Sequence, residues 1–186
     1  KWYACAMKSR QTYREILYSL IGDNHGLITI EMANQVGVPA VELRKLTSRG
    51  ALERAGRGLY RIPFAPLDKF QQAITALAAV GEGATLVSTS VLALFDIGLE
   101  MPTKLLISKS KRTRAQIPSF VRLSEVQPKQ TQIIEGVSCQ SVFEILLERT
   151  RTARLDRVRD EIMQAQKLGF IDEDQANELM SEVTLN

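Results

Sequence analysis

Residues 29–61 read TIEMANQVGVPAVELRKLTSRGALERAGRGLYR, and this stretch decides the fold expected for the first part of the chain. Its apolar positions recur at helical spacing on both sides of Gly37, which is typical of two short helices joined by a tight turn. Thr29 is placed to cap the first helix, and Pro39 can begin the second, where its missing amide costs no hydrogen bond. We therefore predict a helix-turn-helix whose second helix ends at Gly50.

Small and apolar side chains supply the packing that this prediction needs. Ala33 is small where the two helices would cross, and Gly37 can adopt the left-handed backbone of the turn. The shared core is expected to hold Met32, Val36, Val38, Leu43 and Leu46. Residues 11–23 carry apolar side chains at helical spacing, so another helix should precede the pair.

The outward face of the second helix is basic and polar. With Leu43 and Leu46 facing inward, the other face presents side chains that suit the major groove of DNA. They are Glu42, Arg44, Lys45, Thr47, Ser48 and Arg49. Residues 52–62 then alternate around a glycine-containing turn, which predicts two short strands that form a wing. The wing carries Arg54, Arg57 and Arg61, which would contact the DNA backbone or the minor groove. A winged helix used only for protein contacts is the alternative.

The charge of the chain is unevenly distributed. The whole chain has a formal net charge of +3, but residues 1–67 hold ten Lys and Arg against five Asp and Glu, so the remainder is slightly acidic. This asymmetry is expected when one module meets phosphate and the other meets protein or solvent. An apolar content of 45% and a charged content of 24% are ordinary for a globular protein.

The prolines at positions 63 and 66 mark the expected boundary between a domain of residues 1–66 and a second domain of residues 67–186. Helices are predicted from Asp68 and from about Ser88. Strands should follow after Pro102, at residues 105–107, 120–123, 131–134 and 137–139. The expected fold class is α+β, with an N-terminal winged helix-turn-helix followed by a mixed α/β domain that has a small sheet and C-terminal helices.

Capping signals define the C-terminal helices. Ser141 and Glu144 have the spacing of a capping box, in which each side chain satisfies an exposed amide. Two further helices follow, the first ended by Gly169 and the second capped by Asp172 with Gln175. Arginines between positions 149 and 159 alternate with acidic residues, which favours a salt-bridged surface or a partner face over a nucleic-acid stripe.

A basic loop interrupts the predicted strands. It contains Lys109, Lys111, Arg112 and Arg114 and no acidic residue. These side chains are candidates for a secondary phosphate contact, although a run of charge in a loop is more often simply solvated.

The residue inventory argues against catalysis and metal binding. Cys5 and Cys139 lie far apart, and His25 is the one histidine of the chain, so a metal cluster or a Ser-His-Asp constellation lacks its residues. The Glu-x-Lys pair of a metal-dependent nuclease does not occur, and a Gly-rich phosphate loop is missing too. We expect no enzyme activity, no cofactor and no metal. Since no apolar run approaches membrane-spanning length, we expect a soluble, cytoplasmic protein without a membrane partner.

Motifs along nearly the whole chain resemble the AbiEi antitoxins of type IV toxin-antitoxin and phage-abortive systems. They are residues 26–29 before the helix-turn-helix, 49–54 leading to 56–61, 88–95, and 136–138 before the helix that begins at Ser141. The chain departs from relatives in lacking a histidine in the helix at Ser88, and in having Gln140-Ser141-Val142-Phe143 where a Pro-Ala-Arg-Thr-like sequence is common.

This resemblance implies an antitoxin that also represses its own operon. The N-terminal domain would bind inverted repeats in the promoter, and the domain from Leu67 onward would counteract a nucleotidyltransferase toxin encoded beside it. DNA contact would fall to Arg44, Lys45, Ser48 and Arg49 with the wing residues Arg54, Arg57 and Arg61. We expect a monomer in solution. The alternatives are a ligand-responsive winged-helix repressor unrelated to a toxin and, less favoured, a pure interaction protein.

Overall fold

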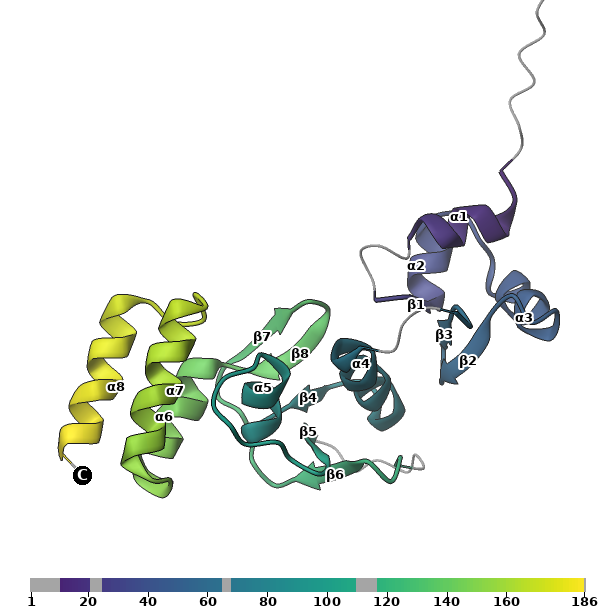
Figure 1. Cartoon of the computed structure of the whole chain (residues 1–186). Helices are drawn as coiled ribbons and strands as arrows, with labels where there is room; N and C mark the ends of the chain where they lie inside the picture. The colour runs from purple at the N-terminus through teal and green to yellow at the C-terminus, as the bar shows by residue number, and fades with distance from the viewer. Residues whose placement is uncertain (1–10, 21–24, 65–67, 110–116, 186) are drawn as a thin grey trace, which may run out of the picture. The chain divides into compact units, whose positions relative to one another are not determined.

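A computed structural model describes residues 11–20, 25–64, 68–109 and 117–185 of the chain. The chain divides into two compact units, Lys1–Leu67 and Asp68–Asn186. Each unit combines helices with a β-sheet, so the fold mixes α and β structure (Figure 1). Among the described residues, no helix is both long enough and apolar enough to cross a membrane.

The first unit alternates short helices with a small sheet. Its elements in order are α1 (Tyr13–Ser19), β1 (Leu27–Thr29), α2 (Ile30–Gln35), α3 (Ala40–Ser48), β2 (Glu53–Gly56) and β3 (Leu59–Arg61). The strands form an antiparallel sheet in the order β1-β3-β2. Strand β1 was not predicted, because a strand of three residues is recognisable only through its pairing with β3, which follows the two helices in the sequence.

Local signals set the helix boundaries of this unit as predicted. The Thr29 hydroxyl accepts a hydrogen bond from the Met32 amide at 3.1 Å, which caps α2. Gly37 turns the chain with φ +78°, and Pro39 is the residue before the first turn of α3. Gly50, with φ +73°, follows the end of α3.

The core of the first unit lies between the helix pair, α1 and the sheet. Its buried members are Leu17, Ile28, Ala33, Val38, Leu43, Leu52, Tyr60 and Ile62. Val36 and Leu46 pack against them and are half-buried, as their positions predicted. Met32 is half-buried and lies outside this cluster, so its assignment to the shared core was wrong. Ala33 is instead the fully buried residue that α2 contributes to this cluster.

The second unit has a five-stranded mixed sheet with helices. Its elements are α4 (Lys69–Val80), β4 (Ala84–Leu86), α5 (Thr89–Leu94), β5 (Leu105–Lys109), β6 (Val121–Ser124), β7 (Thr131–Ile134), β8 (Val137–Gln140), α6 (Val142–Thr152), α7 (Leu155–Lys167) and α8 (Glu173–Leu185). The strand order is β6-β5-β4-β8-β7. β4 pairs in parallel with β8, and β5 pairs in parallel with β6. The central strand β4 was not predicted. Its three residues are all buried, so the strand lacks the alternation of polar and apolar residues that would distinguish it from the helix before it.

The C-terminal helices α6, α7 and α8 pack against one another (Figure 1). The capping box predicted at Ser141 is wrong: that side chain makes no capping hydrogen bond. The Glu144 carboxylate instead accepts from the backbone amides of Lys129 at 2.9 Å and Gln130 at 3.0 Å, in the turn before β7. The predicted cap of α8 is confirmed, since Asp172 and Gln175 exchange side-chain-to-backbone hydrogen bonds at 2.8 and 3.1 Å.

One arginine of the expected salt-bridged surface is buried. The Arg149 guanidinium on α6 forms a two-pronged ion pair with Glu161 on α7, with both distances at 2.7 Å. It also donates to Glu100, in the segment between α5 and β5, at 2.9 Å. Three separate segments therefore meet at this side chain, which a surface helix pattern does not reveal.

Candidate nucleic-acid interface

The exposed face of α3 carries three of the predicted DNA-binding residues. Leu43 is fully buried, which turns Arg44, Lys45 and Ser48 outward. Val41 is 51% exposed and shares this face, because positions i, i+3, i+4 and i+7 of a helix lie on one side. Val41 was not among the residues predicted for this face.

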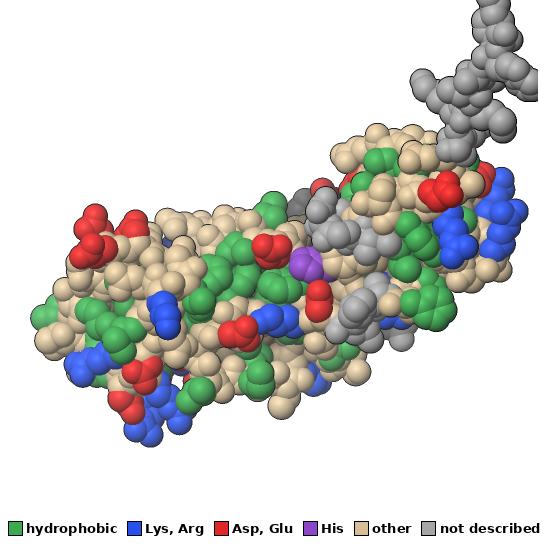
Figure 2. Space-filling view, turned by 45° about the horizontal axis from the view of Figure 1, so that its top comes forward, with side chains coloured by type: hydrophobic (Ala, Val, Ile, Leu, Met, Phe, Trp, Pro, Cys, Tyr) green, Lys and Arg blue, Asp and Glu red, His purple; other side chains and the backbone are tan. Residues whose placement is uncertain are grey.

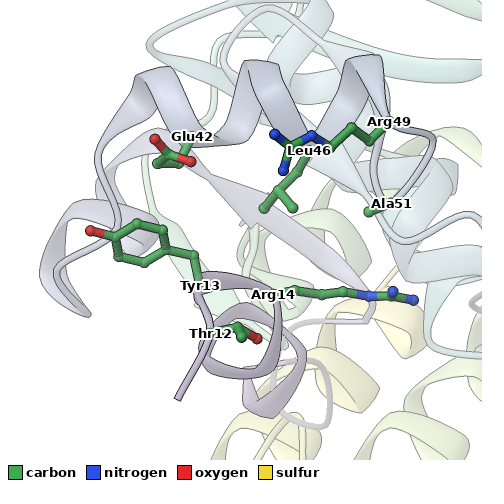
Figure 3. Close-up of a pocket in the computed structure, with 7 residues that line it drawn as sticks. All are labelled: Thr12, Tyr13, Arg14, Glu42, Leu46, Arg49 and Ala51. Atoms are coloured by element: carbon green, nitrogen blue, oxygen red, sulfur yellow. The ribbon is translucent and has the colours of Figure 1, made fainter. Parts of the chain in front are cut away.

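A second stripe of α3 lies next to that face and faces α1. It consists of Glu42 and Leu46 together with Arg49, the residue that follows the last turn of α3; the three are spaced by four and three residues. These residues line a surface pocket of about 400 Å³ together with Thr12, Tyr13, Arg14 and Ala51. Figure 3 shows Tyr13 and Arg14 from α1 on one side of the pocket, and Glu42, Leu46 and Arg49 from α3 and its C-terminal cap on the other. The structure therefore places Arg49 on a different stripe from Arg44 and Ser48.

The cations of α3 differ in whether they are already paired. The Lys45 ammonium lies 2.7 Å from the Glu42 carboxylate, one turn earlier on the helix. Arg44 and Arg49 form no ion pair with any residue that the structure describes. Thr47, a member of the predicted outward face, is half-buried and donates its hydroxyl proton to the Leu43 carbonyl at 2.8 Å. Arg44 and Arg49 are thus available to an anion without breaking an internal bond.

The β2–β3 hairpin holds the three arginines predicted for the wing. Arg57 is exposed in the turn beside Gly58, whose φ is +73°, and forms no ion pair within the described part of the chain. Arg54 donates from Nε to the Gly56 carbonyl at 3.3 Å, where the register of the two strands shifts. Arg61 lies opposite Glu53 in the sheet and is ion-paired with it. Of the three arginines, Arg57 is therefore the one whose charge and hydrogen-bond donors are unused within the described part of the chain.

Positive charge is visible on the surface of the first unit. In the space-filling view, Lys and Arg side chains gather at the right-hand edge of this unit, the side on which α3 lies (Figure 2). Acidic side chains are mixed among them. Two of the acidic residues of this unit, Glu42 and Glu53, are ion-paired with Lys45 and Arg61. The distribution agrees with a surface on which only some of the cations are free to meet phosphate.

The predicted secondary phosphate site is only partly described. Lys109 ends β5, and its ammonium donates to the Val80 carbonyl at 2.7 Å, close to the C-terminus of α4. Lys111, Arg112 and Arg114 lie outside the described residues. The contact of Lys109 stabilises a helix end, because carbonyls there carry partial negative charge.

The described residues include no group of three or more His, Cys, Asp or Glu side chains that could hold a metal ion. Cys139 is a free, buried thiol of β8, and burial raises its pKa to about 11. His25 lies in a turn with φ +50°, before the strand β1.

Comparison with known proteins bears on the first unit. Residues 15–63 match the model of a family described as "Transcriptional regulator, AbiEi antitoxin". The expected resemblance to AbiEi antitoxin regulators is thereby confirmed over residues 15–63, while the motifs at residues 88–95 and 136–138 lie outside the match. No curated protein matches the chain. Among solved structures, the RV2827C protein from Mycobacterium tuberculosis aligns with a TM-score of 0.45 and 13% identity, over 92% of this chain and 82% of that one.

Proposed function

We propose that the first unit of the chain, predicted as residues 1–66, is a winged helix-turn-helix that binds double-stranded DNA, and that the chain is an autorepressor and antitoxin of a type IV toxin-antitoxin operon. One observation carries the proposal. The unit that matches AbiEi transcriptional regulators exposes a basic face on α3 and an unpaired arginine on the β2–β3 hairpin. The element order of helix, strand, helix, helix and hairpin also suits this class of DNA-binding module.

The face of α3 is proposed to read bases in the major groove. A guanidinium such as that of Arg44 can bond both acceptors of a guanine, and the Ser48 hydroxyl can donate to or accept from a base edge. Val41 offers an apolar contact to a thymine methyl group. Arg57 on the hairpin would bind the backbone or enter the minor groove. Bound at inverted repeats in its own promoter, the protein would block transcription of its operon.

The second unit is proposed to counteract a nucleotidyltransferase toxin encoded beside this gene. The word antitoxin in the matching family's description supports this role, and so does the slightly acidic charge of the second unit, which is unsuited to DNA. The protein would act in the cytoplasm as a monomer, without catalysis of its own.

Fluorescence anisotropy in a salt series tests the DNA-binding part. The full chain should prefer a duplex from its own upstream region to a scrambled duplex of equal length. Arg44→Ala should reduce that preference by about 5- to 150-fold, the loss of one base contact worth about 1–3 kcal/mol. Arg57→Ala should weaken binding to both duplexes by the same factor. It should also reduce the slope of log affinity against log salt concentration by about 1. Arg159→Gln, on exposed α7 surface, is the matched control. Equal affinity of wild type for both duplexes would exclude sequence-specific repression.

Co-expression tests the antitoxin part. Growth arrest by the neighbouring nucleotidyltransferase should be relieved by the full chain and equally by Arg44→Ala, because relief is assigned to the second unit. A variant that neither binds the operator nor relieves growth arrest would show that the antitoxin role depends on DNA binding. Failure of the wild type to relieve arrest, with specific DNA binding intact, would favour a repressor unrelated to a toxin.

A further inference from the structure

The pocket between α1 and α3 has a composition that suits an anion with an apolar neighbour. Arg14 lies on its α1 side and Arg49 on its α3 side (Figure 3). Tyr13, Leu46 and Ala51 supply apolar surface to a volume of about 400 Å³. No sequence motif pointed to Arg14, which lies outside the helix-turn-helix and the wing.

The charge of the pocket is positive. Arg14 and Arg49 form no ion pair with any residue in the described ranges. Glu42 is the acidic side chain among the lining residues, and it is already paired with Lys45. Glu15, next to Arg14 in sequence, accepts hydrogen bonds from Thr12 at the start of α1, and these bonds lower its pKa. Two guanidinium groups are therefore left to bind an anion.

Arg14 is also held in position before any ligand binds. Its guanidinium carbon lies 5.0 Å from the centre of the Tyr18 ring, within the range of a cation–π contact. The Tyr18 hydroxyl donates to the Ala51 carbonyl at 3.2 Å, which ties α1 to the turn after α3. Leu17, fully buried, anchors the same helix in the core. A prepositioned arginine loses less side-chain entropy when it binds.

The position of the pocket beside the exposed face of α3 indicates which anion it would bind. The stripe of Glu42, Leu46 and Arg49 borders the face that carries Arg44, Lys45 and Ser48. When a helix lies in the major groove with one face toward the bases, the adjacent flank faces the sugar-phosphate backbone of one strand. A backbone unit presents both a phosphate and the largely apolar face of a deoxyribose, which matches the lining of the pocket.

We propose that this pocket binds one sugar-phosphate unit of the DNA backbone. Arg14 and Arg49 contact the phosphate from the two sides, and Tyr13 and Leu46 contact the sugar. Arg14 is then a DNA-binding residue on α1, and Arg49 positions the protein on the duplex without reading a base. The inference rests on the proposed DNA-binding function.

Anisotropy in a salt series with the full chain also tests this site. Because each neutralised phosphate contributes about 0.9 to the salt slope and Arg49 still contacts this phosphate, Arg14→Gln should lower that slope by at most about 0.9 and the affinity by at most about eightfold at 0.1 M salt. The loss should be equal on the operator and on scrambled DNA. Arg14→Lys should keep most of the slope because it keeps the charge. Arg159→Gln removes the same charge from α7 and should leave both values unchanged.

Neutral methylphosphonate linkages, introduced one at a time into the duplex, locate the contacted phosphate. At that position wild type should lose at least as much affinity as the Arg14→Gln substitution costs, because both arginines then lose the charge they contact, and the variant should lose less than wild type because only Arg49 is affected. Thermal melting of each variant separates a loss of contact from a loss of folding.

Three results would overturn the proposal. If a folded Arg14→Gln variant bound DNA with the affinity and salt slope of wild type, Arg14 would not be part of the interface, and the proposed DNA binding itself would still stand. Stabilisation of wild type by millimolar inorganic phosphate, absent in the variant and accompanied by unchanged DNA affinity, would assign the pocket to a free anion. Absence of salt-dependent binding of wild type to any duplex would refute both this inference and the proposed function.

Discussion

Replacing Glu161 by Gln should destabilise the second unit far more than the same replacement of Glu100. Arg149 lies between these two carboxylates and is ion-paired with both. The Glu161 side chain is 3% exposed and that of Glu100 is 41% exposed. Desolvated charges depend on their partners, whereas solvent screens an exposed pair.

The expected magnitudes follow from this difference in burial. Removing one member of a buried ion pair costs about 3–5 kcal/mol of unfolding free energy, because the other charge is left without its partner. Glu161→Gln should fall near the lower end, about 3 kcal/mol, since Glu100 still faces Arg149 and the amide oxygen still accepts one hydrogen bond. Glu100→Gln should cost about 0.2–1 kcal/mol, as measured for exposed pairs.

Urea unfolding of the full chain, with hydrogen exchange of the α6 and α7 amides, measures both losses. Exchange from α2 and α3 serves as the internal control, because those helices belong to the first unit. A double variant, Arg149→Met with Glu161→Leu, should be less destabilised than Arg149→Met alone. The single variant leaves the Glu161 carboxylate buried without its cation, whereas the double variant removes both charges. Equal losses for Glu161→Gln and Glu100→Gln would refute the assignment of a buried, energetically dominant pair.

Two further predictions concern titratable groups of the second unit. Partial desolvation and the nearby Glu144 raise the pKa of Glu148, which is an exposed side chain, despite opposing contributions from Gln140 and Lys129. The folded state therefore disfavours its ionised form, and wild type loses a little stability as the pH rises through this titration. Glu148→Gln should therefore stabilise the unit in urea unfolding at pH 7 but not below about pH 4; a gain independent of pH would contradict this. In a Cys5→Ser variant, Cys139 should react with a disulfide reagent at pH 8 on the order of 100-fold more slowly than a free thiol, because its pKa is raised to about 11. Rapid labelling of the folded protein would show that this thiol is accessible.

Features that depend on neighbouring residues could be read from the sequence. The cap at Thr29, the turn at Gly37 and the cap at Asp172 all use groups within a few residues of each other. Their preferred conformations are set by local sterics and hydrogen bonding, which any chain with these residues experiences. The same local periodicity identified Leu43 as an inward position and Arg44 as an outward one.

Only the tertiary structure decided the features that join distant segments. Strands β1 and β4 are too short to be recognised alone, and their hydrogen bonds come from strands far along the chain. Glu144 has the spacing of a capping residue, yet two amides before β7 bind its carboxylate. The pairing of Arg149 with Glu161 likewise arises when packing brings separate helices together, as does the presence of both Arg14 and Arg49 in the lining of one pocket. Such contacts gain their free energy from burial and proximity in space, which the order of residues along the chain does not reveal.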